Sequence, residues 1–312
     1  MSLEISLIVV LAAMLHASWN ALLRAGTDRL WSMTMMCIAI ALVCGGLPPF
    51  VPLPAAASWG CLILSGVLHI GYNLFLVRTY RDGDLGQTYP IARGSSPLLV
   101  SLGAAIFAGE LPDPISMAGV MLVSAGIISL AFQGRRLGFD NLRYALGTGC
   151  FIGAYSVTDG IGVRLSGTPV GYTVWMCLLW GIMMPPVYVL LRDGRSLIRG
   201  PRETWTAAAG GIVSLVAYGI IIFAMSFGPM GPVSALRETS VVFAALIGRI
   251  FLKERLTAYR IIACIIVAIG AICIGHKNGS IASPHLPKTF PVSRSSRSHE
   301  PRGVNETLHL AT

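Results

Sequence analysis

Charged side chains are scarce in this chain. Asp, Glu, Lys and Arg together make up 12% of the 312 residues, whereas hydrophobic residues make up 54%. The charged fraction is roughly half of that in an average soluble domain. Such an excess of apolar surface indicates that many side chains face lipid, so we expect a membrane protein and not a soluble one.

Catalytic and metal-binding signatures are also missing. The sequence has no Gly-Lys-Ser/Thr phosphate-binding loop, no HExxH, no GxSxG and no acidic cluster in any loop. Its seven cysteines include no CxxC pair, which argues against a zinc site and a disulfide framework. We therefore predict that the chain is not an enzyme, has no catalytic residues, and holds no cofactor and no metal.

Long apolar runs are the main feature that is present. A bilayer core about 30 Å thick needs about 20 apolar residues per helical span. Lipid offers no partner for backbone N–H and C=O groups, which an α-helix satisfies within itself. The sequence predicts an all-α integral membrane protein with ten transmembrane helices, at residues 3–23, 31–50, 57–77, 86–108, 115–133, 142–162, 172–191, 204–227, 232–252 and 260–276.

Positive charges are distributed unevenly among the loops. Lys and Arg occupy the loops after the first, third, fifth, seventh and ninth runs, and the alternate loops hold only Arg164. By the positive-inside rule, the basic loops are cytoplasmic and both termini lie outside, although the basic tail disagrees. Because the net charge of +9 follows this pattern, we expect a lipid bilayer as partner and no nucleic acid.

The chain contains an internal repeat. Residues 93–126 align with residues 237–270 at a constant offset of 144 residues. We predict two five-span repeats at 1–133 and 134–276, followed by a disordered tail at 277–312. An odd number of spans inverts the second copy, which is a transporter architecture. Alternatively, the duplication only enlarged a helical bundle or built a channel.

Short motifs within this repeat carry a family likeness. LHASWNAL at 15–22, YPIARG at 89–94, RETS at 237–240 and KERL at 253–256 resemble the EamA branch of the drug/metabolite transporter superfamily. The resemblance implies ten helices around a cavity lined largely by spans one, three, four, six, eight and nine, which opens alternately to either side. Family members export amino acids and other metabolites, exchange sugar nucleotides or are related to small multidrug exporters.

Arg93, Arg237 and Arg249 lie inside predicted spans, and the first two are related by the repeat. Arg93 is in the fourth span and Arg237 is at the equivalent place in the ninth. A charge in the bilayer usually turns toward a cavity or a partner, and a guanidinium matches carboxylate or phosphate. Both are candidates for binding an anionic group of the substrate. Alternatively, Arg237 neutralises Glu238 or Asp159, and Arg93 bonds to backbone carbonyls.

Three other residues are candidates for proton coupling. Asp159 and Glu238 are carboxyl groups in a low-dielectric region, where the protonated form gains relative weight, and His16 could relay a proton. Each also has a structural interpretation, as a permanent ion-pair partner or a hydrogen bond between helices.

Aromatic and polar residues on the cavity-facing spans complete the expected substrate site, because small-molecule sites combine aromatic walls with a few polar groups. The further substrate-binding candidates are Trp19, Asn20, Tyr72, Tyr89, Tyr155 and Tyr218. Pro90 and Pro97 flank Arg93 and predict that the fourth span is bent or gating, or that it is only kinked to fit its neighbours.

These observations favour a secondary transporter, an exporter or exchanger of a small polar metabolite that is amino-acid-like or an organic anion. We expect a monomer or homodimer with multiple spans in the cell (inner) membrane. The competing hypotheses are a multidrug or cation exporter and a non-transporting integral membrane protein. The first span carries His16 and Asn20 in place of the membrane-embedded glutamate of small multidrug exporters, which weakens the cation hypothesis.

Overall fold

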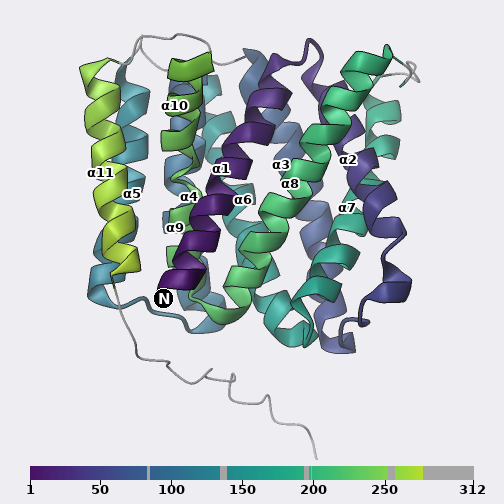
Figure 1. The fold of residues 1–312 in the computed structure, drawn as a ribbon, viewed down its shortest axis with the longest axis horizontal. Helices are drawn as coiled ribbons and strands as arrows, with labels where there is room; N and C mark the ends of the chain where they lie inside the picture. The colour runs from purple at the N-terminus through teal and green to yellow at the C-terminus, as the bar shows by residue number, and fades with distance from the viewer. Residues whose placement is uncertain (83–84, 134–138, 193–196, 198, 252–256, 277–312) are drawn as a thin grey trace, which may run out of the picture. The chain divides into compact units, whose positions relative to one another are not determined.

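The computed structural model describes residues 1–82, 85–133, 139–192, 197, 199–251 and 257–276, and these are helical with short connections (Figure 1). The tail predicted to be disordered lies outside the described residues. The helices are α1 (Leu3–Ala25), α2 (Arg29–Gly45), α3 (Trp59–Asp82), α4 (Leu85–Ala108), α5 (Pro114–Ser129), α6 (Phe139–Ser166), α7 (Pro169–Leu191), α8 (Pro201–Phe227), α9 (Met230–Arg237), α10 (Ser240–Phe251) and α11 (Ala258–Gly275), with 3-10 turns Pro48–Phe50, Ala56–Ser58 and Leu130–Gln133.

Eight segments of the described residues are long and apolar enough to cross a membrane. The multi-pass character predicted from hydropathy is therefore confirmed at this coarser level. Two predicted spans are not among the eight. Helix α2 is apolar but has only 17 residues, and the apolar sequence of α6 is interrupted by polar residues such as Ser156 and Asp159.

The predicted ninth span is divided, whereas the predicted fourth span is not. Helix α9 ends at Arg237 and α10 begins at Ser240, so Glu238 and Thr239 lie at the break. Helix α4 instead runs unbroken through Pro90 and Pro97. Pro97 lacks the N–H that would bond to the Arg93 carbonyl, and the Ser96 hydroxyl donates to that oxygen at 3.0 Å. This bond replaces the one that Pro97 cannot make, and α4 continues as helix through the proline.

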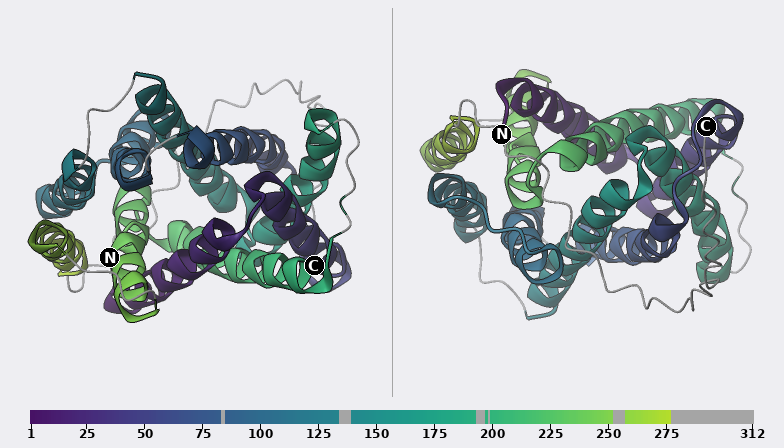
Figure 2. Two further views of the ribbon diagram at one scale, coloured as in Figure 1. Left: turned by 90° about the horizontal axis from the view of Figure 1, so that it is seen from above. Right: turned by 90° about the horizontal axis from the view of Figure 1, so that it is seen from below.

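Helices from the two halves of the chain pack on one another in matching pairs (Figure 2). Helix α1 packs on α8, and their counterparts at the repeat offset, α6 and α3, also pack on each other. Helices α2 and α7 form a further pair. Helices α5 and α11 lie side by side at one end of the bundle in both figures.

Glycines bring α5 and α11 into backbone contact. A Cβ atom on Gly119 would lie 2.7 Å from the Gly270 carbonyl oxygen, and one on Gly126 would lie 3.3 Å from the Ala263 carbonyl oxygen. The repeat offset exchanges these two contacts, since it maps Gly119 to Ala263 and Gly126 to Gly270. Small residues permit such close packing in membranes.

Gly270→Ala is expected to destabilise the protein by about 1–3 kcal/mol, because overpacking forces neighbouring groups to shift. The new methyl group would lie 2.8 Å from the Gly119 oxygen and 2.9 Å from the Val123 backbone nitrogen. Thermal unfolding in detergent measures the effect. Gly60→Ala is the control, since nothing lies within 4 Å of its Cβ position. Equal melting temperatures for the two variants would contradict the close contact.

Candidate functional site

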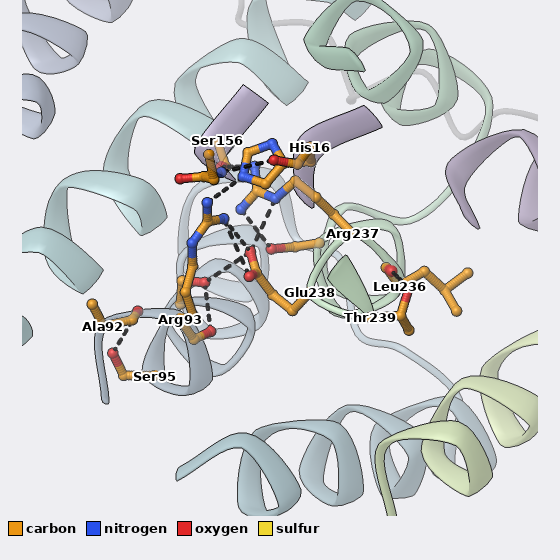
Figure 3. A network of polar contacts seen from close by, with 12 residues as sticks. His16, Ala92, Arg93, Ser95, Ser156, Leu236, Arg237, Glu238 and Thr239 are labelled. Atoms are coloured by element: carbon orange, nitrogen blue, oxygen red, sulfur yellow. Dashed lines mark hydrogen bonds and ion pairs between the residues drawn. The ribbon is translucent and has the colours of Figure 1, made fainter. Parts of the chain in front are cut away.

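Two arginines share one carboxylate in the interior (Figure 3). Nη1 of Arg93, on α4, donates to both Glu238 oxygens at 3.2 Å. Nε of Arg237, at the end of α9, donates to Oε1 of Glu238 at 3.1 Å. The side chains of Arg93, Arg237 and Glu238 are 1%, 0% and 0% exposed, respectively. With both guanidinium groups and the carboxylate ionised, this cluster carries a net charge of +1.

Serine hydroxyls complete the cluster. Arg237 donates to the hydroxyls of Ser156 on α6 and Ser234 on α9, each at 3.4 Å. The Ser96 hydroxyl lies 3.4 Å from Oε1 of Glu238. The Nε atom of Arg93 is buried without a hydrogen-bond partner. The Arg93 guanidinium therefore has one N–H group without an acceptor, which is unusual for a buried polar group.

His16 connects this cluster to α1. Its Nδ1 atom accepts a hydrogen bond from the Trp19 indole at 3.1 Å, and its Nε2 atom contacts Nη2 of Arg93. The Asn20 side chain donates to the His16 carbonyl at 2.8 Å. A protonated imidazole has no acceptor atom, and a neutral one has one. A neutral ring can therefore accept one of the two hydrogen bonds, and a protonated ring can accept neither.

Asp159 lies apart from the shared carboxylate cluster. It is 0% exposed on α6, and its two oxygens accept hydrogen bonds from the hydroxyls of Tyr172 on α7 at 3.0 Å and Tyr218 on α8 at 2.6 Å. No described cation forms an ion pair with it. Of the two carboxylates predicted as partners of Arg237, the structure thus pairs it with Glu238.

A small aromatic cavity lies beside these groups. Its volume is about 30 Å³, and α1, α2, α3, α6, α7 and α8 line it. This volume is sufficient for a water molecule but not for a metabolite. Aromatic walls surround it, formed by Trp19, His69, Tyr72, Tyr155, Trp180 and Tyr218. The His69 and Tyr155 rings stack with centroids 4.0 Å apart.

Two polar atoms in the cavity wall lack partners. Oδ1 of Asn73 and Nε1 of Trp180 are buried without a hydrogen bond. They supply an acceptor on α3 and a donor on α7. Buried polar atoms are usually satisfied, so this arrangement suits a small polar guest.

The expected site residues fall into three groups. Trp19, Tyr72, Tyr155 and Tyr218 line the cavity, as does His16. Arg93, Arg237 and Glu238 form the adjoining cluster, and Tyr89 lies under the Arg93 guanidinium, 5.3 Å from its ring centroid. Asn20 is buried on α1 and Asp159 is bound to Tyr218, and neither lines the cavity.

The helices that line the cavity differ from the spans expected to do so. Helices α2 and α7, which were not expected there, contribute wall residues, and α4 and α9 contribute none. Trp180, His69 and Asn73 were consequently not among the expected substrate-binding residues. Trp180 lies in an apolar run without charges, so hydropathy gave no signal for it. Its indole N–H in mid-span was the one available indication.

Ion pairs connect helix ends at both ends of the bundle. At one end, Asp28 accepts hydrogen bonds from Arg192 at 3.0 Å and Arg199 at 2.9 Å. At the other end, Arg164 pairs with Glu110 and donates to the Gly228 carbonyl at 2.8 Å. Salt bridges thus link neighbouring helices at both ends of the bundle.

The described residues thus combine apolar helices of membrane-spanning length with a buried charged cluster and an aromatic cavity. Residues 142–275 match the model of the EamA-like transporter family, which belongs to the drug/metabolite transporter superfamily. The family predicted from the short motifs is therefore confirmed. A match to this family suggests a membrane transporter.

The fold also resembles solved structures, and 28 chains match it. One is titled "Crystal structure of protein" and superposes with a TM-score of 0.67 at 19% sequence identity. The match covers 86% of this chain and 94% of that chain. At this identity, the likeness concerns the fold alone. A comparison with curated proteins finds no match.

Proposed function

We propose that this protein is a secondary transporter, an exporter or exchanger of a small polar metabolite with an anionic group, in the cell (inner) membrane. Arg93 and Arg237 bind the anionic group, and the aromatic cavity encloses the rest of the molecule. The observation that carries this proposal is that two buried guanidinium groups share one carboxylate. Glu238 can balance only one of the two guanidinium charges, and a substrate carboxylate or phosphate could pair with the other.

The proposal includes an inverted repeat, which the packing of the helices supports. The matching packing of α1 on α8 and α3 on α6 is expected of two related halves. The start of α1 and the end of α6 lie at the same end of the bundle, because Met1 and Arg164 both approach Gly228, so these helices run in opposite directions, as inversion requires. We propose ten spans in two five-helix halves, with α2 and α6 as further spans and α9 with α10 as one interrupted span. Interrupted helices at the repeat interface are common at transporter binding sites.

The observed cavity suits a closed state of such a transporter. Its 30 Å³ cannot hold a metabolite, and salt bridges cross both ends of the bundle. Opening would have to separate the aromatic rings and release Arg93 or Arg237 toward the incoming anion. Alternating access requires a state in which neither side is open.

Counterflow into proteoliposomes tests the proposal. Vesicles with the purified protein are preloaded in turn with each unlabelled amino acid, hydroxy acid, dicarboxylate and sugar phosphate, and uptake of the labelled compound is followed. Saturable, counter-substrate-stimulated uptake of an anionic or zwitterionic compound is the expected result. Linear, unsaturable flux would indicate a channel instead.

The same assay distinguishes anion transport from cation export and from a protein that transports nothing. Transport of quaternary ammonium dyes with no transport of anions would overturn the anion proposal in favour of cation export. No uptake of any panel member, with the protein shown to be folded by its melting transition, would favour a non-transporting membrane protein. A stabilising ligand found by thermal shift narrows the panel beforehand, since a ligand of the native state raises the melting temperature.

A further inference from the structure

Contacts in the interior separate the three candidates for proton coupling. Glu238 accepts hydrogen bonds from two guanidinium groups, so protonating it would sacrifice both ion pairs. His16 faces a donor at each ring nitrogen, from Trp19 and Arg93, and a further proton would remove the single acceptor nitrogen of the neutral ring. Neither residue can gain a proton without breaking the cluster.

Asp159 differs because its hydrogen-bond donors are neutral. Tyr172 on α7 and Tyr218 on α8 donate to its two oxygens, and Ser65 on α3 is a third hydroxyl within reach. A carboxyl group that gains a proton here loses no ion pair, and it can donate in turn to a tyrosine oxygen. Its charge can therefore change at lower cost than that of Glu238.

The surroundings of Asp159 include several titratable groups from the helices packed on α6. Arg237 on α9 is the cation whose charge acts on it, with Arg93 on α4 and Glu238 in the adjoining cluster. The remaining groups are Cys61 on α3, Tyr155 on α6, Cys177 on α7, and its partners Tyr172 and Tyr218. His69 on α3 is linked to the site through its contact with the Ser65 hydroxyl at 3.2 Å.

Charge balance connects this carboxyl group to the anion site. With Asp159 ionised, its negative charge compensates the net +1 of the Arg93, Arg237 and Glu238 cluster, and the interior is neutral. With Asp159 protonated, the interior has one uncompensated positive charge. Binding of a monoanion then restores neutrality, so a proton and an anion favour each other's binding.

We propose that Asp159 is the proton-binding site of the transporter and that one proton moves together with each substrate anion. This inference rests on the proposed function. The proton comes from water on the side to which the cavity opens, is held on a carboxylate oxygen of Asp159, and returns to water on the other side. No other bond forms or breaks.

Tyr218 carries the change of state from the proton site to the cavity. Its hydroxyl bonds to Asp159 and its ring belongs to the cavity wall, 5.3 Å from His69 and 5.8 Å from Tyr155. Protonation of Asp159 weakens the hydrogen bond that fixes this ring. The ring is then freer to move aside as the anion enters.

Infrared difference spectroscopy at varied pH tests the proton site without a substrate. Wild-type protein in lipid is expected to show the carbonyl band of a buried protonated carboxyl group, and Asp159→Asn is expected to lack it. Glu203→Gln is the matched control, because Glu203 is half exposed and its removal should leave the band intact. In Tyr218→Phe the band should already appear at a higher pH than in wild type, since the Asp159 carboxylate loses a hydrogen-bond donor.

Several results would overturn the inference. They are a band that persists in Asp159→Asn, the absence of any such band in wild type, and no shift in Tyr218→Phe. Should Asp159→Asn fail to fold, Asp159→Glu keeps the test available, because it retains a titrating carboxyl group at the site and should move the band without abolishing it. Because this measurement needs no transported compound, it can fail while counterflow succeeds, or succeed while counterflow fails.

Discussion

Arg93→Ala is expected to lower saturable transport by about 100-fold or more, equivalent to about 2.7 kcal/mol of substrate interaction. Removing a buried charged partner of a ligand costs about 2–5 kcal/mol. The variant should nevertheless fold, because Glu238 keeps its ion pair with Arg237 and its contact with Ser96. The interior cluster then has one cation and one anion, so no carboxylate is left unpaired.

Initial rates in proteoliposomes and melting temperatures in detergent, measured on the same preparations, give the two quantities. Arg249→Gln is a suitable control, since Arg249 is an exposed arginine on α10 outside the cluster. The control should transport like wild type. An Arg93→Ala protein that no longer folds would support a purely structural role, and one that transports normally would remove Arg93 from the substrate site.

Glu238→Gln is expected to cause the largest loss of stability, about 3–5 kcal/mol, because it leaves two buried guanidinium groups without their shared carboxylate. Both arginines lie 3.1–3.2 Å from that carboxylate. The neutral amide can still accept a hydrogen bond, but it cannot balance two positive charges. Thermal unfolding and the yield of folded protein measure the effect.

A second substitution distinguishes the contribution of the Glu238 charge to stability from that of its packing. Adding Arg93→Met to Glu238→Gln returns the net charge of the cluster to +1, so the double variant should be more stable than Glu238→Gln alone. Arg93→Met by itself gives the baseline of the double-mutant cycle. Additive losses would show that the carboxylate contributes by packing and not by compensating charge.

Hydropathy predicted the helical membrane character of this chain, because the length of each apolar run reflects the thickness of the bilayer. It did not predict the break between α9 and α10. Residues 232–252 read as one continuous run, although Glu238 and Thr239 interrupt it. Apolar content reports burial in lipid and carries little information about local backbone geometry.

That break also explains why the ion pairs of the site were only partly foreseeable. Successive residues on a regular helix do not face each other, so a bond from Arg237 to Glu238 is unexpected for a continuous span. Because α9 ends at Arg237, Glu238 can turn back toward it. The repeat offset indicated that Arg93 and Arg237 have related positions, but not that one carboxylate would lie between them.

The bond from Arg93 to Glu238 joins the first half of the chain to the second. In the proposed transport cycle, Glu238 therefore competes with the substrate anion, because it pairs with Arg93 whenever no substrate is bound. Arriving cargo has to displace it, which lowers the measured affinity. In return, the ion pair holds the two halves of the substrate-free transporter together, so solutes do not pass through it without being bound. The Glu238 carboxylate thus lowers the affinity for substrate and also suppresses conformational change of the substrate-free transporter.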